Sequence, residues 1–245
     1  MIIRSRLITA GLVTFVVAFI LFFPARVAYR WFAPEIISLA GISGTVWSGN
    51  AREAETNGVY VRNLAWRMQP LTLLTGKLGF AIEASPTSGF FDARFGLGIS
   101  GKVTLTDVKT SLELRSLQQV VGVPGLGGKM NAQFDRLIID AGSPVAADGV
   151  IEIADLVMPR VNRASIGGYR AELFTQESGV VASVEDTDGV IDVAGSLQIT
   201  TDRAYRFIAQ LAPKNDTPAN IRQRLQSLGP ANERGQYELR VEGQL

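Results

Sequence analysis

Short segments in which apolar and polar residues alternate recur along most of this chain. They include residues 101–106, 149–153, 189–193, 195–199 and 235–241, and each opens with Gly. Period-two alternation with β-branched residues and glycine boundaries is typical of β-strands that bury one face. Few intervals between these segments have the length that a parallel crossover requires. The sequence therefore predicts a mainly β fold built from antiparallel strands.

Two pairs of segments resemble each other. The stretch DGVIEIA at residues 148–154 recurs as DGVIDVA at residues 188–194, displaced by 40 positions. The stretch LQQVVG at residues 117–122 resembles LQSLG at residues 225–229, and a glycine-opened strand follows each. Two explanations are open. The pairs reflect either convergent strand and turn chemistry or a duplicated strand–helix–strand unit that extends one sheet.

Residues 218–228 carry the clearest signal for a helix. Thr217 is predicted to cap its first amides, and Pro218 to occupy the first helical position, where a missing N–H costs nothing. Gly229 is predicted to end the helix in the left-handed conformation. Apolar residues at helical spacing predict that one face packs on the sheet; they are Ile221, Leu225 and Leu228.

Three shorter segments are predicted to connect strands. Residues 116–121 suit a short helix, and residues 71–74 suit a single turn after Pro70. The glycine-rich stretch at residues 122–128 lacks the Lys-Ser/Thr pair of a phosphate-binding loop, so we interpret it as a turn between two elements.

Residues 7–23 form an uncharged run of 17 residues. As a helix it would span roughly 25 Å, a little less than a ~30 Å hydrocarbon core. The cluster YRWF at residues 29–32 suits a membrane–water interface. We interpret the run as a retained single-pass membrane helix. A cleaved signal peptide, which has a shorter apolar stretch and a small-residue cleavage site, and a buried soluble helix are the alternatives.

The charges that flank this run give little information on its orientation. Arg4 and Arg6 stand on one side, and Arg26 and Arg30 on the other. A large domain after the first span usually crosses the membrane, which predicts a cytoplasmic N-terminus.

Histidine and cysteine are both absent from the sequence. This excludes Ser-His-Asp and Cys-His catalysis and metal sites built on imidazole or thiolate. A hydrolase using carboxylates or a Ser–Lys pair is the remaining enzymatic option, but no constellation for one is recognisable. We therefore predict no catalytic residue, no cofactor and no metal site. The 24 basic and 23 acidic residues are scattered, which indicates no nucleic-acid partner.

Two tryptophan motifs carry a family resemblance. GISGTVWSGNA at residues 41–51 is followed by LAWRMQP at residues 64–70. With the N-terminal apolar run, these stretches resemble protein N of the bacterial type II secretion system, a family that pairs G-T-x-W-x-G-x-A with a later L-x-W-x-x-x-P. The matching positions, with two downstream glycines, are Gly44, Thr45, Trp47, Gly49, Leu64, Trp66, Pro70, Gly229 and Gly243.

This chain departs from the family pattern at one place. Near Gly149, where the resemblance leads us to expect another Trp, it has Ile151 and Ile153. The local packing there is therefore expected to differ from that of the family.

The resemblance implies an accessory, non-enzymatic inner-membrane protein that acts as a scaffold in the export of folded proteins across the outer membrane. Residues 1–6 would be cytoplasmic, 7–23 transmembrane, 24–40 an interfacial linker and 41–245 a periplasmic β-rich domain. The implied fold is a curved antiparallel sheet of AsmA-like, half-barrel character with one or two short helices. Partners would be inner-membrane lipids, other secretion components and a second copy of the chain. The alternative is an AsmA-like lipid-handling or envelope-biogenesis protein with an apolar groove.

Individual residues also carry expectations. We interpret Trp47 and Trp66 as structural residues, with docking to a partner as the alternative. Gly44 and Gly49 are predicted to adopt positive φ angles. Lys214 is predicted to end a solvated loop. Exposed strand edges are predicted to pair with another envelope protein by strand addition.

Overall fold

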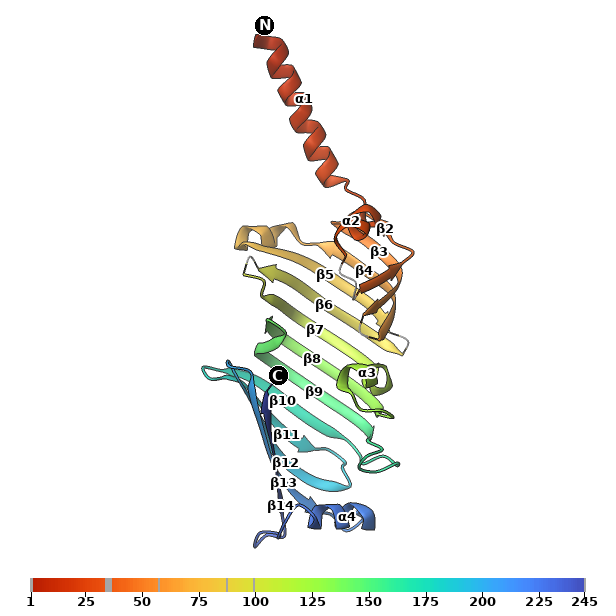
Figure 1. The fold of residues 1–245 in the computed structure, drawn as a ribbon, viewed down its shortest axis with the longest axis vertical. Coiled ribbons are helices and arrows are strands. Elements are labelled where there is room, and N and C mark those ends of the chain that lie inside the picture. Colours follow the sequence, from red (N-terminus) through yellow and green to blue (C-terminus); the bar gives the residue numbers. More distant parts are fainter. Residues whose placement is uncertain (1, 34–36, 57, 87, 99, 245) are drawn as a thin grey trace.

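In a computed structural model of the chain, one long helix projects from the end of a single large curved sheet (Figure 1). The structure describes residues 2–33, 37–56, 58–86, 88–98 and 100–244, with side chains from residue 10 onward. Its helices and 3-10 turns are α1 Ile2–Leu21, α2 Ala25–Phe32, η1 Pro70–Thr75, η2 Leu114–Leu117, α3 Gln118–Val121 and α4 Ala219–Gln226. Within this described part of the chain, no helix combines the length and apolar character that a membrane crossing requires.

The sheet has 14 strands, and all neighbouring strands are antiparallel. Apart from the short β2, which pairs only with β3, the strands follow one another in chain order. The prediction of a mainly β, antiparallel fold is thus confirmed. The strands are β1 Ile37–Ala40, β2 Ser43–Gly44, β3 Ser48–Thr56, β4 Val59–Met68, β5 Lys77–Pro86, β6 Gly89–Gly98, β7 Val103–Glu113, β8 Gly127–Asp140, β9 Ser143–Val157, β10 Tyr169–Gln176, β11 Gly179–Asp186, β12 Ile191–Thr200, β13 Ala204–Pro213 and β14 Tyr237–Gln244.

The sheet has one apolar and one polar face. Residues directly opposite each other on paired strands point to the same face. One such row runs through Ala84, Phe91, Thr110, Ala132, Ile151, Ala171, Val184, Gly195, Ala209 and Leu239, across ten strands from β5 to β14. The neighbouring row on the other face runs through Glu83, Asp92, Lys109, Gln133, Val150, Glu172, Ser183, Ser196, Ile208 and Arg240. The alternation seen in the sequence therefore becomes two chemically distinct surfaces.

Bulges help to curve the sheet. In β4 the register shifts between Arg62 and Ala65, where Asn63 has φ +51°. In the β6–β7 pair it shifts between Asp92 and Arg94, and Asp107 of β7 has φ +52°. A bulge increases the local twist and bends its strand, so repeated bulges turn a flat sheet into a curved one.

Two glycines that were expected to open strands lie inside them. Gly195 sits in the middle of β12. The prediction that residues 189–193 and 195–199 form two separate strands is therefore wrong. A Cβ on Gly195 would lie 3.0 Å from Ala209 Cβ and 3.2 Å from the Phe207 ring. Gly149 lies within β9, where a Cβ would meet Phe134 at 2.6 Å. Both glycines allow a neighbouring strand to come close: Gly195 faces the Phe207 ring of β13, and Gly149 faces the Phe134 ring and the Gln133 backbone of β8.

Helix α4 confirms the expected helix near residue 220, but its ends differ from the prediction. Ile221 and Leu225 are buried, and Leu225 packs with Val193 and Leu211 on the apolar face. Leu228 lies beyond the helix and is exposed. Pro218, not Thr217, occupies the capping position, and it provides no side-chain hydrogen bond.

Thr217 links two loops instead of capping α4. Its hydroxyl accepts a hydrogen bond from Lys214 N at 2.7 Å and donates one to Val190 O. The expected connections at residues 71–74, 116–121 and 122–128 are confirmed as η1, as η2 with α3, and as the turn before β8.

Candidate functional site

The two tryptophan motifs meet where the N-terminal helices join the sheet, and we call this region the junction. Trp47 Nε1 donates a hydrogen bond of 2.7 Å to Ile20 O in the last turn of α1. Val46 N donates one of 3.1 Å to Phe23 O just after α1. These two bonds attach the end of α1 and the residues just after it to the tight turn before β3.

Trp66 holds the same turn from the sheet side. Its Nε1 donates to Thr45 O at 3.2 Å and to Val46 O at 3.1 Å. The ring lies over Gly49, where a Cβ would come within 2.5 Å of Trp66 Cζ2. Both tryptophans therefore make structural contacts within the chain.

The turn itself depends on Gly44 and Thr45. Gly44 has φ +87°, as predicted, and a Cβ there would meet Ser48 O at 2.5 Å. Thr45 N donates to Ser48 O at 2.9 Å, and Ser48 N donates back to Thr45 Oγ1 at 3.1 Å. Gly49 does not have the positive φ that was expected. It is required by the close approach of the Trp66 ring and of Ser43 O, and not by its own backbone conformation.

Helix α2 is fastened to the first strands by Arg26 and Tyr29, for which the sequence did not indicate contacts within the chain. Arg26 Nε donates to Ile42 O, and the Tyr29 hydroxyl both donates to Ile37 O and accepts from Leu39 N, each at 3.0 Å. Ala25, Ile42 and Ala51 form a small buried cluster there, against which Leu64 and Trp66 pack. The spacing of Arg26 and Tyr29 on one helix face is the signal that could have revealed this clamp.

The other motif residues lie at different places. Pro70 begins η1, directly after β4. Gly229 does not end α4 as predicted: Ser227 occupies the C-terminal capping position, and Gly229 lies beyond it with φ +134°. Gly243, on β14, faces Tyr205, and a Cβ there would come within 2.7 Å of the Tyr205 ring. The structure therefore brings seven of the nine motif residues to the same end of the sheet and leaves Gly229 and Gly243 near the C-terminus.

Lys214 corrects a prediction. Its Nζ forms an ion pair with Asp186 Oδ2, and the Asp186 side chain is only 7% exposed. Burial raises the pKa of Asp186, but hydrogen bonds from Lys214 Nζ and Val193 N outweigh this, so its pKa lies below the usual value. The hydrogen bond to Asp186 raises the pKa of Lys214. Lys214 is thus an internal contact of the C-terminal part of the sheet.

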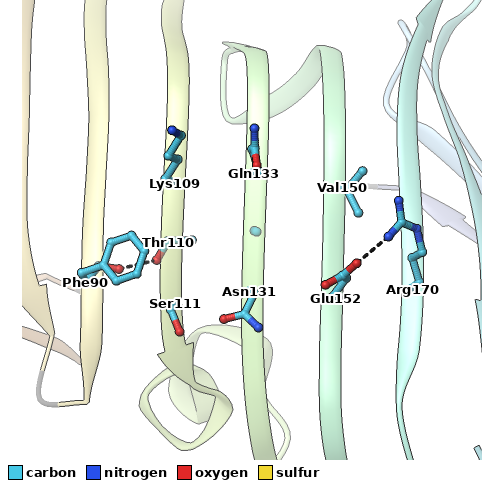
Figure 2. Close-up of a pocket in the computed structure, with 10 residues that line it drawn as sticks. Phe90, Lys109, Thr110, Ser111, Asn131, Gln133, Val150, Glu152 and Arg170 are labelled. Carbon is cyan, nitrogen blue, oxygen red and sulfur yellow. Dashed lines mark hydrogen bonds and ion pairs between the residues drawn. The ribbon is translucent and has the colours of Figure 1, made fainter. Parts of the chain in front are cut away.

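A hollow of about 440 Å³ lies on the polar face between β6 and β10 (Figure 2). Lys109, Asn131 and Gln133 line it, and an ion pair between Arg170 and Glu152 closes one side. These groups can form hydrogen bonds, but no nucleophile is paired with a base among them. In the part of the chain that the structure describes, no three acidic side chains gather as a metal site would require.

The two edges of the sheet differ in length. β1, at one edge, covers 4 residues, and β14, at the other, covers 8. The first half of β14 alternates between half-buried Tyr237 and Leu239 and exposed Glu238 and Arg240, and the rest of the strand is exposed. An edge strand of this length offers a row of backbone groups to a further strand.

Comparisons with known proteins agree with the motif resemblance. Residues 35–240 match the family model for Type II secretion system (T2SS), protein N. Relatives named Type II secretion system protein N occur in Aeromonas hydrophila, at 24% identity over 86% of each chain, and in Vibrio cholerae serotype O1, at 26% identity over 91% of each chain. Another, from Pectobacterium carotovorum subsp. carotovorum, is 25% identical over 58% of this chain and 72% of its own. No solved structure matches the chain.

The family match covers both tryptophan motifs and nearly the whole sheet. The match thus spans most of the chain, and this chain belongs to the family of protein N of the type II secretion system.

Proposed function

We propose that this protein is an accessory inner-membrane component of the type II secretion system, acting as a scaffold in the export of folded proteins across the outer membrane. The observation that carries the proposal is the junction, which fixes a long exposed helix to a broad sheet by hydrogen bonds from Trp47 and Val46. Such an arrangement presents a large surface at a fixed place near a membrane. The comparisons do not favour the lipid-handling role considered above.

The anchor would be residues 7–23, with residues 1–6 in the cytoplasm, 24–40 at the interface and 41–245 in the periplasm. Large apolar side chains of α1 stand exposed, among them Leu12, Phe15, Phe19 and Leu21. A contiguous apolar surface of this kind is unfavourable in water and is satisfied by lipid.

Labelling of single cysteines tests this topology, because the natural chain has none. We expect Asn131→Cys, on the polar face, to react with a membrane-impermeant maleimide in cells with a permeabilised outer membrane. Ser5→Cys should react only after the inner membrane is disrupted. Labelling of Ser5→Cys before disruption would reverse the orientation, and extraction of the protein by alkaline carbonate would contradict the anchor.

The scaffold role predicts protein partners. Mild detergent extraction and affinity capture of the full chain should recover other inner-membrane components of the secretion system, and a second copy of the chain is a further candidate. Loss of this chain should reduce export of the secreted proteins and leave their synthesis unchanged. Recovery of none of the components, together with undiminished export, would contradict the proposal.

A further inference from the structure

The turn η1, between β4 and β5, exposes three leucines. Leu71 is 77% exposed, Leu73 49% and Leu74 85%. Single exposed apolar residues are common on protein surfaces, but three within one short turn form a compact apolar tip. We call these three residues the leucine tip.

The fold itself turns this tip outward. Thr72 points inward: a Cβ on Gly79 of β5 would lie only 2.5 Å from its side chain. Its hydroxyl donates to Gln69 O at 2.6 Å, and Gly76 ends the turn with φ +71°. In a turn that faces only water we would expect the opposite pattern, with a leucine packed against the sheet and Thr72 exposed.

The leucine tip lies at the end of the sheet from which α1 projects (Figure 1). Two hydrogen bonds connect the end of α1 to the base of the tip. Trp47 Nε1 donates to Ile20 O at 2.7 Å, and Met68 N donates to Trp47 O at 2.6 Å, two residues before η1 begins. A surface that meets the end of α1 therefore also lies close to the tip.

The charge around the tip suits a surface of anionic lipid. Residues 57–82 contain no Asp or Glu, whereas Arg67 and Lys77 flank the turn on both sides. Basic side chains beside apolar ones are the usual composition of segments that lie at a membrane interface.

The exposed apolar surface of α1 continues onto α2. Aromatic rings follow one another from α1 through Phe23 to Trp31 and Phe32, with centroid distances of 6.0 and 6.3 Å in the last two steps. Trp31 and Phe32 are largely exposed. Two patches, α2 and the leucine tip, thus flank the junction at the same end of the molecule.

We propose that Leu71, Leu73 and Leu74 insert into the periplasmic surface of the bilayer that α1 crosses. This inference rests on the anchor proposed above. The sheet then touches the membrane at a second point, so it can no longer swing freely about the end of α1. Its polar and apolar faces acquire a fixed orientation relative to the membrane.

The test uses the full chain in nanodiscs of phosphatidylethanolamine and phosphatidylglycerol, with an environment-sensitive fluorophore on a single introduced cysteine. Leu74→Cys reports on the tip. Val121→Cys in α3 is the matched control, because Val121 is an exposed aliphatic residue at the opposite ends of the strands. Phe15→Cys reports on the anchor.

We expect blue-shifted emission at Leu74→Cys, with quenching by lipids that carry a nitroxide near the headgroup, and no quenching at Val121→Cys. Lipids that carry a nitroxide deep in the acyl chain should quench Phe15→Cys. Quenching at Phe15→Cys without quenching at Leu74→Cys would overturn the leucine-tip proposal and leave the anchor intact. Absence of lipid quenching at both would overturn both proposals. A blue shift at Leu74→Cys without lipid quenching would show that protein covers the tip, and would also overturn the proposal.

Discussion

At the scale of single residues, the ion pair between Lys214 and Asp186 joins positions 28 residues apart in the chain. Asp186 also accepts a hydrogen bond of 2.8 Å from Val193 N, so one carboxylate connects the end of β11, the start of β12 and the loop before α4. Local sequence patterns cannot reveal such a pair, because the fold alone brings the two residues together.

Replacing Lys214 with Met should destabilise the protein by about 1–2 kcal/mol, since a largely buried carboxylate loses its cationic partner. Urea unfolding of the detergent-solubilised full chain, followed by circular dichroism, measures this change. Lys102→Met is the matched control, because the pair between Lys102 and Asp140 is exposed on both sides and should contribute about 0–1 kcal/mol. Equal effects of the two substitutions would contradict the role given to Lys214.

The same pair predicts a pH dependence. Because the folded state lowers the pKa of Asp186, its stabilising contribution is complete above the unfolded-state value of about 4 and is lost as the pH falls through the lower folded-state value. The difference in unfolding free energy between the parent and Asp186→Asn should therefore be constant from neutral pH down to about 4 and shrink below it. A difference that persists unchanged in stronger acid would be inconsistent with this linkage.

The contact between Gly49 and Trp66 gives another prediction at this scale. In Gly49→Ala the new methyl group would lie 2.5 Å from both the Trp66 ring and Ser43 O. We expect a loss of about 1–3 kcal/mol and an altered Trp fluorescence spectrum. Gly96→Ala, where the nearest atom would be 3.7 Å away, should be close to neutral. An unchanged spectrum and stability in Gly49→Ala would refute the proposed packing.

At the scale of elements, the sequence predicted the features that depend on neighbouring residues in the chain. Alternating residues predicted antiparallel strands, and the three short connections lie where they were expected. The errors have physical causes beyond local pattern. Gly195 lies within a strand because Phe207 of the next strand needs the space, and Thr217 bonds to Val190 O, 27 residues away, instead of capping α4.

At the candidate site, too, local sequence predicted the turn but not the contacts between distant residues. Glycine next to Thr-x-Trp predicted a tight turn, and Gly44 confirms it. The sequence did not reveal that Trp47 would bond to Ile20 O, because that contact depends on where α1 ends relative to the sheet. Spacing places Arg26 and Tyr29 on one face of α2, but the backbone groups that they bind are determined by how α2 packs on the first strands.

Helix α4, in the connection between β13 and β14, should hold this pair of strands in place. Leu225→Ala removes a buried side chain that packs on Val193 and Leu211, and should cost about 2–4 kcal/mol. Limited trypsin digestion should then cut faster at Arg234, in the connection between α4 and β14. Gln226→Ala, on the exposed side, should leave the cleavage rate unchanged, and equal rates in both variants would contradict the role of α4.

At the scale of the whole molecule, one layer of strands leaves two free edges. The longer one, β14, should be the site of strand addition by a partner. A photoreactive group on Arg240→Cys should crosslink to another envelope protein in cells. Gln133→Cys, in the same row of the polar face but in the middle of the sheet, should give far less product. Equal crosslinking at both positions would favour binding across the face and contradict edge pairing.

The strand order has a consequence for how this molecule is made. From β3 onward each strand pairs with the strand that precedes it in the chain, so the pairings are local in sequence; the connection from β13 to β14 is a longer one and contains α4. Contacts of this low order form quickly and do not wait for distant parts of the sequence. If α1 is held in the membrane, the sheet can assemble hairpin by hairpin as the chain is translocated. During that time the most recently added strand is the one unpaired edge that grows, and β14 is the last strand to be added.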